Sequence, residues 1–273
     1  MTRRVLMCPP SFFDVQELKN PYMGQPIDRR RALQQWQSLC RTLEESGVGI
    51  ETIEPIPGLE DMVFAANPVF VGHGEKVGNF VVPSRMRFPI RQQEVSHYVD
   101  WFRQRGYKII EIDFADEYLE GQGDLIWHPD HTKIWGAYGF RSTRGGVEKF
   151  AQAMQPLQIP VTPLELVDPH CYHLDTCLCP LSEEAALIYP RAFSPEALSL
   201  LRGGWKRIHE LIMEEAHQFM GNGILVEGGY VTPHLTTHLR QILKEEGLRP
   251  ILVDTSEFEK SGGSAFCMKA WLE

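Results

Sequence analysis

Short apolar runs alternate with longer amphipathic stretches along most of the chain. The longer stretches predict helices that bury one face. Proline near three of their starts and glycine after three of their ends are typical of helix boundaries. The predicted helices are Asp28–Ser46, Pro89–Arg105, Gly145–Met154, Ser194–Met220 and Thr232–Glu246.

The shorter apolar runs predict strands, because each spans only a few residues. They are Val5–Cys8, Val48–Ile53, Val69–Gly72, Phe80–Val82, Ile109–Ile112, Leu125–His128, Ala186–Ile188 and Ile251–Val253. Strands that alternate with helices in this way indicate an α/β fold.

One local pattern occurs five times: a polar residue in a Gly- or Ala-rich approach, followed by an apolar run. These anchor residues, which recur about every 50 positions, are Asn67, Asp124, Asp175, Asn222 and Cys267. Too few residues follow Cys267 to complete the fifth repeat, and residues 1–60 contain the strand, helix and strand that it lacks. We therefore expect a ring of five ββαβ units with pseudo-fivefold symmetry. The ring would be one domain, residues 1–273, closed by residues 1–60 pairing with the C-terminal strand; chance recurrence is the alternative.

Composition and charge narrow the function classes. The chain has 273 residues, of which 43% are hydrophobic and 23% charged, and its net charge is −9. Such an acidic protein repels nucleic acids and anionic membranes, but it can bind a small cation. We find no signal-peptide core and no run of roughly 18 apolar residues, so we expect a cytoplasmic protein with six reduced cysteines.

If the ring forms, its anchors converge on one axial site that holds two carboxylates and a thiol. His173 stands two residues before Asp175, and residues two apart on a strand share a face. Thiol, imidazole and carboxylate together suggest nucleophilic catalysis. Paired carboxylates bind a planar cation such as a guanidinium bidentately.

Three strings in the chain resemble the guanidino-group-modifying enzymes: LEGQGD (Leu119–Asp124), HLD (His173–Asp175) and SGGSAFCMK (Ser261–Lys269). That family includes arginine deiminase, dimethylarginine dimethylaminohydrolase, arginine dihydrolase and glycine amidinotransferase. The resemblance covers nearly the whole chain. It implies the pentein fold, a five-bladed α/β propeller, and a small cationic guanidino substrate such as arginine. No cofactor and no metal ligand is expected, and a homo-oligomer is compatible with the sequence.

The resemblance implies a role for each matched residue. Cys267 would attack the guanidinium carbon. His173, oriented by Glu120, would protonate the departing amine and then activate water against the S-alkylthiouronium intermediate. Asp124 and Asp175 would hold the guanidinium nitrogens.

Further residues resemble the substrate-binding positions of the family. Asn20, in NPYM, would lie near the ligand in a covering segment, and residues 14–25 are the expected mobile cover. Arg141 in GAYGFRS, and Arg87 or Arg85 in SRMRFPIR, would grip a substrate α-carboxylate. Lysines on both sides of Cys267 predict a lowered thiol pKa.

Two departures from the deiminase pattern resemble the arginine dihydrolase branch. Arginine deiminases typically carry EGGD, where this chain has EGQGD, and many family members carry aspartate in place of Asn67. An amide donates as well as accepts hydrogen bonds, so Asn67 suits a neutral urea product and a second hydrolysis to ornithine. Deimination to citrulline, hydrolysis of dimethylarginine, and amidinotransfer, in which an amine replaces water, remain alternatives.

Two other protein classes are alternatives to a guanidino-group-modifying enzyme. A catalytically inactive pentein that serves as a binding module has no reason to retain all five catalytic and guanidinium-binding residues. A zinc hydrolase could use Cys171, Cys177 and Cys179, but a C-x-C spacing without a second paired cluster fits zinc poorly. We interpret His209 and His217 as surface or packing residues.

Overall fold

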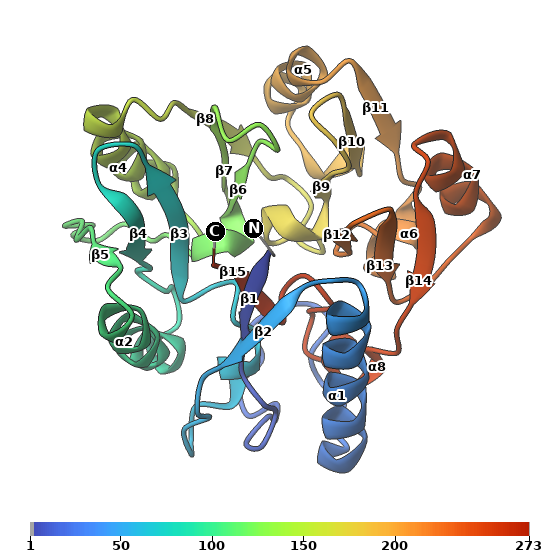
Figure 1. Cartoon of the computed structure of the whole chain (residues 1–273), viewed down its shortest axis with the longest axis horizontal. Helices are drawn as coiled ribbons and strands as arrows, with labels where there is room; N and C mark the ends of the chain where they lie inside the picture. The colour runs from blue at the N-terminus through green and yellow to red at the C-terminus, as the bar shows by residue number, and fades with distance from the viewer. Residues whose placement is uncertain (1–2, 273) are drawn as a thin grey trace.

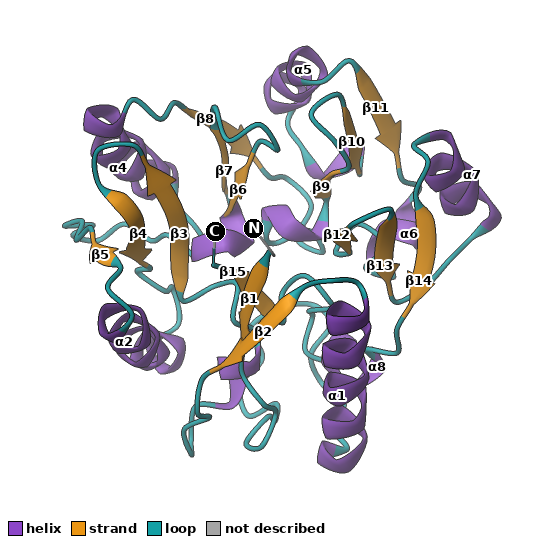
Figure 2. Ribbon diagram, viewed as in Figure 1, coloured by secondary structure: helices purple, strands orange, loops and turns teal. Residues whose placement is uncertain are grey.

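Five small sheets stand in a ring in the computed structural model, which describes residues 3–272 (Figure 1). Each sheet has three strands, and the longer helices lie around the outside of the ring (Figure 2). The strands are β1 (Arg4–Met7), β2 (Gly49–Thr52), β3 (Val69–Gly74), β4 (Gly78–Pro83), β5 (Lys108–Ile109), β6 (Leu125–Trp127), β7 (Ile134–Tyr138), β8 (Val161–Glu165), β9 (Leu178–Pro180), β10 (Ala185–Ile188), β11 (Arg207–Glu210), β12 (Ile224–Val226), β13 (Gly229–Thr232), β14 (Arg249–Leu252) and β15 (Lys269–Trp271).

Every sheet repeats the same connectivity. Its first two strands are antiparallel, and its second and third are parallel and joined through a helix. The crossover helices are α1 (Arg29–Glu45), α2 (Pro89–Gln104), α4 (Arg144–Met154), α5 (Pro195–Gly204) and α7 (Thr237–Glu245). This arrangement confirms the predicted ring of five ββαβ units and the α/β fold class.

The fifth sheet contains both ends of the described chain. β15 pairs antiparallel with β1, with Trp271 opposite Val5, and β1 pairs parallel with β2. The two ends therefore lie close together near the centre of the ring (Figure 1). No helix within residues 3–272 is long and apolar enough to cross a membrane.

The predicted long helix Ser194–Met220 is wrong. The structure divides it into α5, the strand β11 and the short helix α6 (Met213–His217). The helix ends at Gly204, where a Cβ would lie 2.4 Å from the Trp135 ring, and Trp205 after it has an extended backbone. The residues that follow pair with β10 and complete the fourth sheet. β7 and β8 were missed because Gly136 and Pro163 interrupt their apolar patterns.

Candidate active site

The five anchor residues all stand just before the first strand of a unit. Asn67 precedes β3, Asp124 ends the short helix α3 (Gly121–Asp124) before β6, Asp175 lies in the 3-10 helix η3 (Leu174–Thr176) before β9, Asn222 precedes β12, and Cys267 precedes β15. All five side chains are buried. The expectation that His173 and Asp175 share a strand is wrong, because η3 begins between them.

Cys267 is held between an acceptor and a donor. Its Sγ lies 3.1 Å from Asp175 Oδ2 and 3.2 Å from Asn222 Nδ2, and only 2% of the residue is exposed. Burial and the neighbouring Asp175 carboxylate raise the pKa of the Cys267 thiol well above its usual range. The resting sulfur is therefore a thiol that donates to Asp175.

The lowered thiol pKa predicted from the flanking lysines is thus wrong. Lys260 Nζ pairs with Glu257 Oε2 at 2.7 Å, so its charge is already compensated. Lys269 is fully buried, and its Nζ lies 3.0 Å from the centroid of the Phe266 ring. Burial lowers the pKa of Lys269 well below its usual range, which favours the neutral amine.

The SGGS string before Cys267 is shaped by close contacts. Gly262 has φ +89°, and a Cβ there would lie 2.5 Å from the Asn20 amide. At Gly263 a Cβ would meet the Phe64 ring at 2.5 Å. Two consecutive glycines therefore let the covering segment and a ring of the pocket wall approach the turn that positions the thiol.

His173 and Glu120 form a buried pair beside the thiol. His173 Nε2 lies 2.8 Å from Glu120 Oε2, which also accepts a bond from Arg141 Nη1 at 3.0 Å. Burial opposes ionisation of Glu120, but Arg141 and His173 outweigh it and hold the pKa of this carboxyl far below its usual range. Glu120 is therefore a fixed anion that orients the imidazole.

Asp124 lies behind His173 and is not among the residues that line the cavity. Its Oδ2 accepts from Ser142 Oγ at 2.6 Å and lies 4.0 Å from His173 Nε2, while its Oδ1 accepts from Leu174 N at 3.1 Å. Protein donors thus bind both oxygens of Asp124, and its expected direct contact with a guanidinium stays a prediction.

Asp175 keeps one oxygen without a partner. Oδ2 faces the thiol, whereas the buried Oδ1 has no hydrogen-bond partner among the described residues. Burial raises the pKa of Asp175 to about 7, and the hydrogen bond from Cys267 only partly offsets this effect. The carboxyl can thus change its protonation state near neutral pH.

Asn67 also has unused hydrogen-bonding capacity. Its Oδ1 accepts from Arg91 Nη1 at 3.0 Å, while its Nδ2 is buried without a partner among the described residues. A Cβ at Gly123 would lie 2.2 Å from this Nδ2. Gly123, the second glycine of EGQGD, therefore leaves room for the Asn67 amide at the site.

The cavity around these groups is narrow, with a volume of about 10 Å³, the space of about one water molecule. It is lined by Asn20, Met23, Asp61, Phe64, Asn67, Arg91, Arg141, Tyr172, His173, Ser261, Gly263 and Cys267. Asn20 belongs to the covering segment, and its Nδ2 donates to Ser261 O at 2.9 Å. The neighbouring Lys19 is buried, and its Nζ lies 3.1 Å from Glu60 and 3.0 Å from Asp61.

The two expected carboxylate-binding arginines are placed differently from expectation. Arg141 lines the cavity, but its terminal nitrogens donate to Glu120 and to the carbonyl oxygen of Lys19. The side chain of Arg87 is exposed and packs over the Tyr118 ring, and only its backbone N reaches Glu120. Arg141 therefore holds Glu120, and its expected contact with a substrate carboxylate stays a prediction, whereas the Arg87 guanidinium lies outside the cavity, contrary to expectation.

Several residues that line the cavity were not predicted from the sequence, above all Asp61 and Arg91. Asp61 Oδ1 has no hydrogen-bond partner among the described residues, whereas Oδ2 lies 3.0 Å from the Lys19 ammonium. Arg91 is buried within α2 and paired with Glu94 at 3.0 Å. The available signals in the sequence were the two acidic residues Glu60 and Asp61, a few positions before the anchor Asn67, and the Arg-x-x-Glu pattern that begins at Arg91 in α2.

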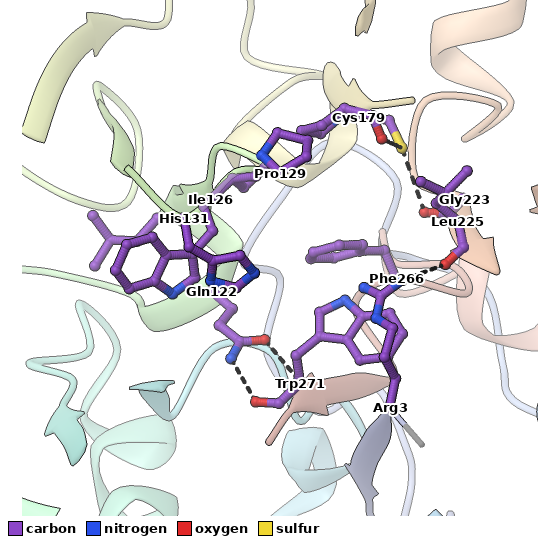
Figure 3. A pocket seen from close by; sticks show the side chains of 13 residues that line it. Arg3, Gln122, Ile126, Pro129, His131, Cys179, Gly223, Leu225, Phe266 and Trp271 are labelled. Atoms are coloured by element: carbon purple, nitrogen blue, oxygen red, sulfur yellow. Dashed lines mark hydrogen bonds between the residues drawn. The ribbon is translucent and has the colours of Figure 1, made fainter. Parts of the chain in front are cut away.

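A second and much larger cavity of about 430 Å³ is lined by residues that neighbour the active site along the chain (Figure 3). Gly223 follows the anchor Asn222, and Phe266 precedes Cys267. Apolar and aromatic groups such as Leu225 and Trp271 form most of its wall. Its lining residues include no Asp or Glu.

Comparisons with known proteins agree with this geometry. Residues 18–272 match the family model of "N,N dimethylarginine dimethylhydrolase, eukaryotic". The chain is 35% identical over 268 residues to the N(G),N(G)-dimethylarginine dimethylaminohydrolase of Mycobacterium tuberculosis, covering 97% of this chain and 84% of the relative. It is 33% identical over 270 residues to the bifunctional arginine dihydrolase/ornithine cyclodeaminase ArgZ of Synechocystis, covering 97% of this chain but 37% of that protein. The solved product-bound N-terminal domain of ArgZ, a cyanobacterial arginine dihydrolase, superimposes with a TM-score of 0.92 at 32% identity, covering 100% of this chain and 98% of the domain.

Proposed function

Since the chain belongs to the N,N dimethylarginine dimethylhydrolase family, within the guanidino-group-modifying enzymes, we propose that it hydrolyses the guanidino group of L-arginine through a covalent intermediate on Cys267. The observation that carries the proposal is one narrow cavity lined by the buried Cys267 thiol and by His173, whose imidazole is paired with Glu120. Arginine dihydrolase and dimethylargininase relatives support the same class of C–N bond hydrolysis.

Catalysis would begin when the thiol proton moves to Asp175 Oδ2, 3.1 Å away. The sulfur then attacks the guanidinium carbon, and His173 gives a proton to the departing amine. Water next attacks the S-alkylthiouronium carbon while His173 accepts its proton, and the C–S bond breaks. Arginine and water thus give citrulline and ammonia, and Cys267 is restored.

We assign guanidinium binding to Asp175 Oδ1 and to Asp61, because both present buried acceptor atoms without hydrogen bonds among the described residues. Asp61 also lines the cavity. Charge-assisted bonds from a guanidinium would satisfy these atoms. Asp124 is then a positioning residue that supports His173 from behind.

The Asn67 amide favours a second hydrolysis. Its buried Nδ2 has a free donor that can bind the carbonyl oxygen of bound citrulline. A second attack with another water would release ammonia and carbon dioxide and leave ornithine. Dimethylarginine is the second candidate substrate, supported by the mycobacterial relative, and would yield citrulline and dimethylamine.

Substrate entry requires the cover to move, because a cavity of about 10 Å³ cannot hold arginine. Residues 14–25 are the proposed cover, and Asn20 and Met23 from this segment line the cavity. We further propose that residues 1–273 act as one catalytic domain, alone or in a homo-oligomer. A cytoplasmic location is supported by the six free cysteines.

Mass spectrometry of the products from arginine and dimethylarginine tests the proposal, with Cys267→Ser as the control. Ornithine from arginine supports two hydrolytic steps, and citrulline alone supports deimination. Dimethylamine released only from dimethylarginine would move the substrate assignment to the second candidate. If a product needs an added amine acceptor, the enzyme is an amidinotransferase. If neither compound reacts, the arginine assignment fails.

A further inference from the structure

We propose that Asp168, His170 and His217 form a binding site for a divalent transition-metal ion of the Zn²⁺ class, separate from the catalytic cavity. Asp168 and His170 lie in the segment between β8 and η3. His217 is the last residue of α6. The fold thus brings together side chains almost 50 positions apart, which no sequence motif links.

The spacing of the three side chains matches what a small ion requires. Asp168 Oδ1 lies 3.3 Å from His170 Nδ1, and Asp168 Oδ2 lies 3.6 Å from His217 Nε2. One ligand atom from each residue can be chosen so that all three lie within 4.8 Å of one another. Tetrahedral Zn²⁺ with bonds of about 2.0–2.1 Å places its ligand atoms about 3.4 Å apart. An ion could therefore bind with small side-chain rotations.

His217 carries an unexplained buried nitrogen. Its Nε2 is shielded from solvent and has no hydrogen-bond partner among the described residues, since 3.6 Å to Asp168 is too long. Other histidines next to carboxylates make short bonds: His209 to Glu246 at 2.7 Å, and His234 to Glu259 at 3.0 Å. A buried polar atom that is left unsatisfied destabilises the fold, because it has lost its hydrogen bonds to water. A bound metal ion would accept the lone pair of this nitrogen.

The surrounding backbone holds the aspartate ready for an ion. The amide of His170 donates to Asp168 Oδ1 at 2.9 Å, which fixes the carboxylate. The two imidazoles stack with centroids 4.5 Å apart and an interplanar angle of 25°.

Two imidazoles and one carboxylate favour Zn²⁺, Co²⁺ or Ni²⁺ over Mg²⁺ or Ca²⁺, which prefer oxygen ligands alone. The side chains are 18%, 43% and 27% exposed for Asp168, His170 and His217, so water can complete the coordination.

The site lies directly beside the cover of the catalytic cavity. The Tyr22 ring meets His170 edge-on at 5.7 Å and packs against Phe219 at 4.7 Å. The Tyr22 amide in turn donates to Asn20 Oδ1 at 3.0 Å. An ion that joins His170 to α6 would therefore brace the surface on which the covering turn rests, without touching substrate.

The test is a titration of the Cys267→Ser protein with Co²⁺ and Zn²⁺, because this variant removes the catalytic thiol as a competing ligand. We expect one ion per chain by calorimetry, and a Co²⁺ spectrum without thiolate-to-metal charge-transfer bands. His217→Ala and Asp168→Asn in the same background should each weaken binding at least about tenfold. His131→Ala is the matched control, because it lies in the string His128-Pro129-Asp130-His131, where two histidines flank an aspartate outside the proposed site, and it should bind as before.

Thermal melting separates loss of the site from loss of the fold. Without metal, the Asp168→Asn variant should melt within a few degrees of its parent, and Zn²⁺ should raise the melting temperature of the parent but not of the variant. The proposal is overturned if Asp168→Asn and His217→Ala both bind the ion as the parent does. Loss of binding in His131→Ala, or thiolate bands in the Co²⁺ spectrum, would equally overturn it. Because no step uses turnover, the outcome is independent of the proposed reaction.

Discussion

The two cavities beside the ring axis differ in size and in chemistry, and the smaller one carries the reactive groups. The cavity at Cys267 measures about 10 Å³ and is lined by buried charged residues such as Asp61 and Arg91. The other measures about 430 Å³, and its lining residues include no Asp or Glu (Figure 3). Neighbouring residues of the same chain segments line both, as Phe266 and Cys267 do.

The cysteines of the two cavities show what this difference means. Cys179 also lines its cavity, but its Sγ faces two backbone carbonyl oxygens, at 3.8 and 3.9 Å, and the Tyr230 hydroxyl, and burial raises its pKa to about 11. Cys267 instead has Asp175 and Asn222 within 3.2 Å. The arrangement of acid, base and amide groups, rather than the volume of the cavity, therefore identifies the cavity at Cys267 as the reactive one.

The largest expected effect separates these two cysteines. Cys267→Ser should reduce turnover of the substrate by about four orders of magnitude or more, because a hydroxyl is a far weaker nucleophile than a thiolate. Cys179→Ser should change turnover by less than about threefold, since its sulfur faces carbonyl oxygens and the Tyr230 hydroxyl rather than a carboxylate. Steady-state rates with product quantification measure both. Equal losses of turnover in the two variants would contradict the assignment of the reaction to the cavity at Cys267.

Glu120→Gln should lower kcat by about two to three orders of magnitude. The amide keeps the shape of the side chain but removes the negative charge that orients His173 and stabilises its protonated form. Leu225→Gln on the wall of the larger cavity is the comparison and should leave kcat within about twofold. Circular dichroism of both variants checks that the fold is intact.

The pH dependence should report Asp175. Below about pH 7 this carboxyl is protonated and cannot accept the Cys267 proton, so kcat/KM should fall about tenfold per pH unit on the acid side. A flat profile between pH 5 and 7 would exclude Asp175 as the proton acceptor.

The same raised pKa predicts a stability effect with a defined sign. A carboxyl whose pKa is about 4 when unfolded and about 7 when folded stabilises the fold most below pH 4. This contribution is lost as the pH rises to about 7. Asp175→Asn removes the dependence, so its unfolding free energy relative to wild type should be higher at pH 8 than at pH 5. Urea denaturation at both pH values measures the difference.

The smallest effect concerns the cover. Asn20→Ala removes the bond to the Ser261 carbonyl oxygen, so the closed state should lose about 1 kcal/mol, and KM should rise several-fold. Arg103→Ala, whose exposed ion pair with Asp100 lies on α2, should leave KM unchanged. Limited proteolysis within residues 14–25, slowed by substrate, provides a second measurement.

Much of the architecture could be predicted because it repeats. A polar anchor before each unit implied the ring, and the EGQGD, HLD and SGGS strings named residues that the structure brings to one site or directly behind it. The error at Ser194–Met220 arose because β11 carries polar residues and pairs with β10 by long-range hydrogen bonds, which leave no local apolar pattern.

The roles that were missed depend on contacts between distant segments. Lys19 meets Glu60 and Asp61 about 40 positions away, and Arg141 meets Glu120. A sequence shows that such charges exist, but their pairing is set only when the ring closes. The contact between the Arg141 guanidinium and Glu120 was therefore not predicted.

The claim that the reactive cysteine lies in the smaller cavity is tested most directly by labelling with 2-chloroacetamidine, a guanidinium-like alkylating agent, followed by peptide mass spectrometry. We predict one adduct, on Cys267, whose formation is suppressed by saturating arginine. An adduct on Cys179 in the larger cavity, or labelling of Cys267 that arginine does not slow, would contradict the account.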